Sequence, residues 1–143
     1  DKYCHQVPLK PGALEFLQAL KARGIAAGIA SSNGIELVHA VLKAQGVSEY
    51  LDSVHTCCDV ERGKPQPDIY LLVAKELGAA PEECLVMEDI PMGLLAGKRA
   101  GMKVCAVEDA FSRNQEAEKR RLADYYIQDY YDILQETYEV LKP

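Results

Sequence analysis

Apolar positions along the chain alternate between short continuous runs and helical spacing. Continuous runs, typical of strands buried on both faces, stand at 25–30, 84–87 and 103–107, with weaker strand candidates at 53–57 and 125–127. Helical spacing occupies the intervals, at about 11–24, 35–46, 68–77, 93–100 and from 131 onward. Because strands alternate with helices of about ten residues, we predict an α/β fold, a Rossmann-like parallel sheet with helices on both faces.

Composition narrows the classes of partner. The chain has 143 residues, of which 48% are hydrophobic and 27% charged, as in ordinary globular domains. Sixteen basic and twenty-two acidic residues give a net charge of −6, which argues against nucleic acid as a partner. No apolar run reaches the roughly 20 residues of a membrane span, so we expect no membrane partner. Five cysteines, an odd number without a CxxC pair, predict a reducing cytoplasm.

The stretch 113–124 is unusually polar. Seven of its twelve residues are charged, with mixed signs. Mixed charge at this density is typical of a helix face in contact with water rather than of a binding tail. We therefore expect its charged side chains to be solvated.

Polar residues follow the first apolar run at the point where the next helix begins. Ser31, Ser32 and Asn33 precede Gly34, and free backbone N–H groups with a hydroxyl at a helix start form an anion site. The same residues would also serve as an ordinary N-cap. The pattern alone leaves both interpretations open.

Two further signals follow the later strands. Lys64 stands on a stiff turn before Pro65, which suits a positive charge held for a phosphate, although a solvated surface lysine fits as well. Glu88 and Asp89 directly follow the run 84–87. Adjacent carboxylates at a strand end suit Mg²⁺, or they interact with the dipole of the next helix.

The three signals gain weight together. In an open α/β sheet, ligands bind outside the carboxyl ends of the strands. The predicted fold brings a hydroxyl, an ammonium group and a carboxylate pair to the same edge. That combination is what phosphoryl transfer requires.

The sequence resembles the haloacid dehalogenase superfamily, and within it the phosphatases and mutases similar to β-phosphoglucomutase. The matching stretches are 9–17, 29–33, 59–70, 85–93 and 100–102. The resemblance implies Mg²⁺ as cofactor and a small phosphorylated metabolite, such as a sugar phosphate, as substrate. It implies Lys64 and Asp89 as catalytic residues, Ser31, Ser32, Asn33 and Lys64 as phosphate-binding residues, and Asp89 and Glu88 as metal ligands.

Two departures from the family pattern concern the active site. Ile90 stands where the family usually has Ser or Ala, which removes a nearby hydroxyl, and we expect the metal site to survive this change. The larger departure is the first family motif, an Asp-x-Asp whose first Asp attacks phosphorus. No two aspartates of the chain are separated by two positions. The first central strand of the family core, which carries that motif, and the helical cap are also missing from this chain.

These departures set our expectation of domain organisation. We interpret 1–8 as a linker returning from an absent cap, 9–111 as a core with motifs two to four, and 112–143 as C-terminal helices and a short strand. A longer protein or a strand-donating fragment is expected to supply the missing N-terminal segment between the strands at 26–30 and 85–88. The isolated chain should therefore hydrolyse no phosphate ester. The alternative is a catalytically inactive phosphate-binding module.

Overall fold

The computed structural model describes residues 10–32 and 34–142, and it has the predicted α/β architecture. The strands form two sheets. In the smaller sheet β1 (Gly28–Ser31) pairs in parallel with β2 (Ser53–Thr56). In the larger sheet the order is β3 (Leu85–Glu88), β4 (Lys103–Val107), β5 (Tyr125–Ile127) and β6 (Glu139–Val140), and β6 alone runs antiparallel.

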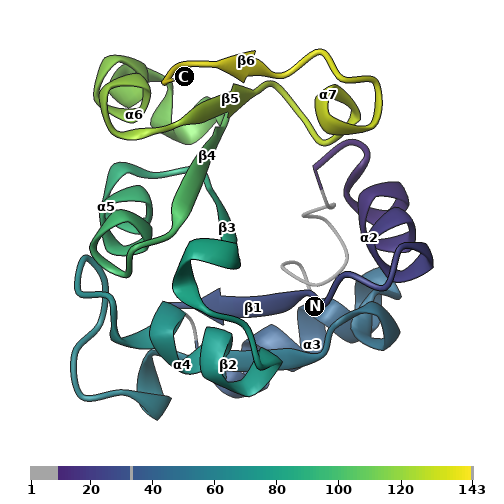
Figure 1. Ribbon diagram of the computed structural model, residues 1–143. Helices are drawn as coiled ribbons and strands as arrows, with labels where there is room; N and C mark the ends of the chain where they lie inside the picture. The colour runs from purple at the N-terminus through teal and green to yellow at the C-terminus, as the bar shows by residue number, and fades with distance from the viewer. Residues whose placement is uncertain (1–9, 33, 143) are drawn as a thin grey trace.

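Helices cover both sheets. The α-helices are α2 (Ala13–Ala22), α3 (Ile35–Gln45), α4 (Asp68–Leu77), α5 (Pro91–Arg99), α6 (Glu116–Leu122) and α7 (Tyr131–Leu134). The 3₁₀ turns are η1 (Ser48–Tyr50), η2 (Cys57–Asp59), η3 (Pro81–Glu83) and η4 (Ala110–Gln115). In Figure 1, α5 and α6 lie to the left of the larger sheet, and α2 and α7 lie together on the right. No helix of the described residues is long and apolar enough to cross a membrane.

Most strand predictions are confirmed, with small shifts at the ends. The strands at 103–107 and 125–127 have the predicted bounds, whereas β1 begins only at Gly28. The turn that ends α2 explains this shift, because Gly24 adopts a φ of 70° and the Ile25 N–H donates to Leu20 O over 2.9 Å. Ile25 is therefore 51% exposed and precedes the strand.

Two expectations about the C-terminal part are wrong. The helix predicted from Tyr131 lasts only to Leu134, after which the chain turns into β6. The stretch 113–124 is not a uniformly solvated face, because Lys119 and Leu122 of α6 are buried. Because charged residues of both signs interrupt the stretch, its sequence shows no apolar spacing from which the buried face of α6 could be predicted.

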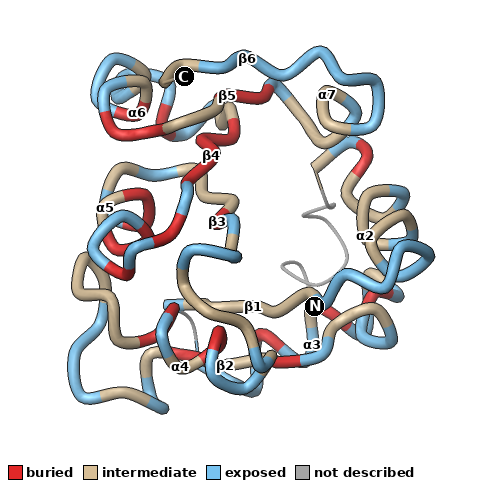
Figure 2. Tube along the Cα trace, viewed as in Figure 1, coloured by how far each residue is buried: buried red, intermediate tan, exposed pale blue. Residues whose placement is uncertain are grey.

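The two sheets share no strand pairing. β1 pairs with β2 alone and β3 with β4 alone among the described residues, in agreement with the expected lack of pairing between 26–30 and 85–88. Burial follows the same division. Four of the five residues of β4 are buried, whereas all four residues of β1 are only half-buried (Figure 2). β1 and β3 thus each have one edge that pairs with no strand of the described chain.

Helix α4 connects the two sheets through the hydrophobic core. It packs against β1 and β2, and the Val73 Cγ1 atom leaves no room for a side chain at Gly28. At the same time Ile69 and Tyr70 of α4 belong to the core cluster of Val86 and other residues of the larger sheet. The core, rather than a continuous hydrogen-bond ladder, therefore holds the described parts together.

Helix α5 approaches the larger sheet closely at Gly97. A Cβ atom there would lie 2.7 Å from Val104 Cγ1 and 3.0 Å from Val86 Cγ2. Val104 is completely buried, and Val86 is 5% exposed, so neither short side chain has space to move. The absence of a side chain at this position lets α5 lie directly on β3 and β4.

We predict that Gly97→Ala destabilises the full-length protein by about 1–2 kcal/mol. Two contacts at or below 3.0 Å with buried side chains put the overpacking cost at about 2–3 kcal/mol, in the upper part of the usual range, and the better helix propensity of Ala returns about 1 kcal/mol. Urea denaturation measures the change. Gly63→Ala is the control because no atom lies within 4 Å of its Cβ position. Equal stability of Gly97→Ala and the parent would contradict this packing.

Candidate functional site

Lys64 connects the carboxyl ends of β1 and β3. Its Nζ donates a hydrogen bond to Ala30 O over 3.0 Å and another to Glu88 Oε2 over 2.5 Å. The side chains of Lys64 and Glu88 are only 9% and 11% exposed. The surface-lysine interpretation is therefore wrong, and the structure holds a largely buried ammonium group between the two sheets.

Glu88 is fixed from a second side by α4. The Tyr70 hydroxyl donates to the same Glu88 Oε2 atom over 2.5 Å, and Lys64 Nζ lies 5.1 Å from the centroid of the Tyr70 ring. Burial and the Glu88 carboxylate raise the pKa of Tyr70, so the hydroxyl remains a donor. A Cβ atom at Gly93 would lie 2.1 Å from the Glu88 carboxyl carbon. A glycine at 93 is thus needed to accommodate this carboxylate.

Asp89 follows Glu88, and its side chain shares a hydrogen bond with Asp109, two residues after the end of β4. Burial, a hydrogen bond with Asp109 and the charge of Glu88 raise the pKa of Asp89 to about 6. Burial also raises the pKa of Asp109, but hydrogen bonds with Asp89, the Phe111 amide and Lys10 outweigh it and lower this pKa to about 2. Of the two carboxyls, Asp89 is therefore the one whose negative charge its surroundings stabilise less.

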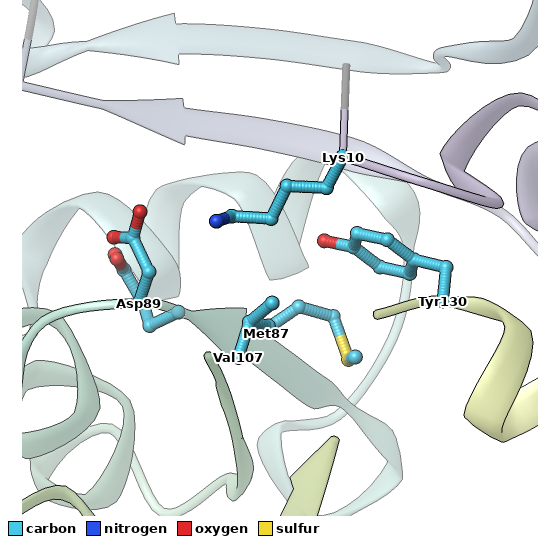
Figure 3. A pocket seen from close by; sticks show the side chains of 6 residues that line it. Lys10, Met87, Asp89, Val107 and Tyr130 are labelled. Atoms are coloured by element: carbon cyan, nitrogen blue, oxygen red, sulfur yellow. The ribbon is translucent and has the colours of Figure 1, made fainter. Parts of the chain in front are cut away.

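A small hollow of about 180 Å³ opens beside this pair. It is lined by Lys10, Met87, Glu88, Asp89, Val107 and Tyr130. Figure 3 shows the amine of Lys10, the carboxylate of Asp89 and the hydroxyl of Tyr130 pointing toward the same space. Lys10 Nζ also lies 3.1 Å from Asp109 Oδ2 and donates to Glu108 O over 3.0 Å. One wall of the hollow therefore carries a cation and the other wall carries carboxylates.

Of the predicted phosphate-binding residues, Ser31 lies next to Ala30, whose carbonyl Lys64 contacts. Ser31 ends β1 directly after Ala30, and the Ser32 carbonyl accepts a hydrogen bond from Cys57 Sγ over 3.1 Å. Gly34, rather than Ser31 or Ser32, occupies the N-cap position of α3, so the capping interpretation is wrong for these two serines. Asn33 lies outside the described residues.

The side chains at the predicted metal site have donor atoms of the kind that Mg²⁺ prefers. Asp89 and Asp109 offer hard oxygen ligands, and Asp89 forms no ion pair with a basic side chain of residues 10–32 and 34–142. The dipole alternative gains no support, because the first turn of α5 contains no acidic residue and Ile90 is its N-cap. In the described part of the chain, no three His, Cys, Asp or Glu side chains are arranged to hold a metal ion. The carboxylates fit Mg²⁺ as part of a ligand set completed by water and substrate oxygens.

Sequence reasoning missed several residues of this site. Lys10, Tyr70, Asp109 and Ser112 were not singled out, although each contacts a predicted site residue or its partner. Asp109 had a usable signal, since it follows the apolar run 103–107 as Asp89 follows 84–87. Lys10 had none, because its contact with Asp109 joins positions 99 residues apart.

Comparison with known proteins places this geometry in a family. A family model described as haloacid dehalogenase-like hydrolase matches residues 2–101. Hexitol phosphatase A of Escherichia coli (strain K12) is 44% identical over 97 residues, which are 68% of this chain and 44% of that protein.

Solved structures agree with this match. A haloacid dehalogenase family hydrolase from Deinococcus radiodurans R1, with bound phosphate and sodium, has a TM-score of 0.80 and 30% identity, covering 89% of this chain and 58% of that one. A β-phosphoglucomutase from Clostridium difficile has a TM-score of 0.73 and 25% identity, covering 89% and 55%. This chain thus spans about half the length of these relatives. It belongs to the haloacid dehalogenase-like hydrolases, in the subgroup of phosphatases and mutases similar to β-phosphoglucomutase.

Proposed function

We propose that the protein catalyses Mg²⁺-dependent phosphoryl transfer, hydrolysing or isomerising a small phosphorylated metabolite such as a sugar phosphate. The observation that carries the proposal is the largely buried Lys64 ammonium, held between Ala30 and Glu88. Ser31 directly follows Ala30, and Asp89 directly follows Glu88. A phosphatase relative and a structural neighbour with bound phosphate support the same chemistry.

Each residue has a physical role in this proposal. Ser31 binds the phosphoryl group with Ser32 and Asn33, and the Lys64 ammonium stabilises the negative charge that develops on its oxygens. Asp89, with Glu88 as a second candidate ligand, holds Mg²⁺. When bound, the ion neutralises phosphoryl oxygens. Because Glu88 Oε2 already accepts from Lys64 and Tyr70, its main contribution is to keep the ammonium in place.

The nucleophile is proposed to come from outside the 143 residues. The chain contains no Asp-x-Asp pair, and an attacking carboxylate is needed to form an aspartyl-phosphate. A segment placed between β1 and β3 would deliver such a residue beside Lys64 and Asp89. A reducing cytoplasm remains the expected compartment, from the cysteine pattern.

The missing Asp-x-Asp pair also favours a second candidate, a phosphate-binding module without turnover. Steady-state hydrolysis of p-nitrophenyl phosphate by the full-length protein, with and without Mg²⁺, decides between the two. Mg²⁺-dependent turnover supports the enzyme. Saturable binding of inorganic phosphate without turnover supports the module.

We predict that Asp89→Asn lowers Mg²⁺-dependent hydrolysis by the full-length protein by roughly 100-fold, because it removes a formal charge where the ion is held. Asp52→Asn is the matched control, since Asp52 is exposed and precedes the first residue of β2, at the opposite end of the smaller sheet. Unchanged activity of Asp89→Asn would show that another residue is the ligand.

The isolated 143-residue chain should show no turnover of any phosphate ester, with or without Mg²⁺. Lys64 and Ser31 supply binding and charge neutralisation, but these do not replace the covalent step. The assay compares this chain with the full-length protein at equal concentration. Measurable hydrolysis by the 143 residues alone would overturn the proposed origin of the nucleophile.

Tyr70→Phe should lower kcat/KM by about 10- to 100-fold, because loss of a hydrogen bond to a charged group costs about 1.5–3 kcal/mol and frees Glu88 to move. The ring over Lys64 is retained, so the variant tests the hydroxyl alone. Tyr138→Phe removes a hydroxyl from an exposed ring that packs on Tyr125 and serves as control. If Tyr70→Phe keeps the parental kcat and KM, Glu88 does not need Tyr70.

A further inference from the structure

Outside the site, Lys119 on α6 is an unusual residue. Its side chain is fully buried, at 0% exposure. Lysine is almost never fully buried unless its charge is compensated, because removing an ammonium group from water is costly. Among the described residues, Lys119 forms no ion pair within 4.0 Å with a carboxylate. Its burial therefore needs an explanation in terms of what its ammonium group holds.

Lys119 Nζ donates to two acceptors at the end of the larger sheet. One is Val107 O, at 2.7 Å, and the other is Ser112 Oγ, at 3.1 Å. The face of the Tyr126 ring lies 5.8 Å from Nζ and covers another side of the ammonium group. Lys119 thus fixes the chain two residues before Asp109 and three residues after it.

The contact with Ser112 also determines where the serine proton points. An ammonium group can only donate, so Ser112 Oγ accepts from Lys119, and its single proton is left to donate elsewhere. The acceptor is Asp89 O, at 2.7 Å, while Asp109 O is more distant at 3.5 Å. Ser112 itself is 2% exposed. The result is a directed chain of hydrogen bonds from Lys119 through Ser112 to the backbone of Asp89.

Charge gives a second reason for a lysine at this position. Burial lowers the pKa of Lys119, whereas the charges of Glu108, Asp89 and Asp109 raise it, and Lys10 lowers it further. These carboxylates belong to the same end of the larger sheet as the hollow described above. Lys119 therefore lies near enough to these carboxylates to feel their charge, and it forms no direct ion pair with any of them.

We infer that Lys119 is a positioning residue for the metal-binding carboxylate Asp89: through Val107 and Ser112 it sets the backbone position from which Asp89 presents its oxygens to Mg²⁺, with Asp109 beside it. It touches neither the ion nor the substrate. This inference rests on the proposed function, since it assumes that Asp89 holds the ion.

The test is Mg²⁺ binding to the full-length protein, measured by isothermal titration calorimetry without substrate. Lys119→Met keeps the length of the buried side chain and removes its donors, and Ser112→Ala breaks the chain without a charge change. Both should weaken Mg²⁺ affinity by about tenfold, the usual lower value for residues that orient ligands. The double variant should bind about as weakly as Lys119→Met, because both changes interrupt one chain.

The sign of the effect separates positioning from other roles. Removing a positive charge by itself favours a bound cation, so a purely electrostatic role predicts tighter binding by Lys119→Met. A merely structural role predicts lower thermal stability with unchanged Mg²⁺ affinity. Either result overturns the inference. If Lys119→Met does not fold, Ser112→Ala decides the question alone, and parental affinity in that variant overturns the inference.

Arg121→Met is the matched control. Arg121 lies on the same helix, and its side chain is 66% exposed and pairs with Glu118 on the surface. The Arg121→Met variant should bind Mg²⁺ with the parental affinity. A tenfold loss of affinity in this control would show that any charge change on α6 has this effect. If the parent protein binds Mg²⁺ and both variants bind it with the parental affinity, this inference alone is overturned. Parent protein that binds no Mg²⁺ overturns the proposed function and this inference with it.

Discussion

The pair between Lys64 and Glu88 is the constraint on which the site depends. β1 and β3 share no strand pairing in the described chain, so their carboxyl ends are aligned by side chains instead of by a hydrogen-bond ladder. Lys64 contacts both ends, Tyr70 fixes Glu88 from α4, and a glycine at 93 leaves space for the carboxylate. An ion pair this buried loses much of its hydration, and the extra hydrogen bond from Tyr70 offsets part of that cost.

The carboxylates at the end of the larger sheet differ in whether a basic side chain pairs with them. Lys64 balances Glu88 and Lys10 balances Asp109, while Asp89 carries no such partner in the described chain. A divalent cation at Asp89 would supply the positive charge that this carboxylate lacks. The candidate phosphate-binding and metal-binding residues thus stand side by side, with Asp89 outside the ion pair that joins Lys64 and Glu88.

The sequence was sufficient for the fold and for part of the site. Short apolar runs followed by polar residues identified Lys64, Glu88 and Asp89, because strand ends in a parallel sheet share one edge. It was insufficient for Lys10 and Lys119. Lys10 acts across nearly the whole chain, and Lys119 is one lysine within a charged stretch whose inward face has no clear period. Tertiary packing, which local pattern does not encode, selects which lysine is buried.

The most direct test of this account is a crystal structure of the full-length protein grown with Mg²⁺ and a phosphate analogue. The account predicts the analogue within hydrogen-bond distance of Lys64 Nζ and Ser31, the ion on Asp89, and a further strand between β1 and β3. Direct backbone hydrogen bonds between β1 and β3, or an analogue bound away from Lys64, would contradict it.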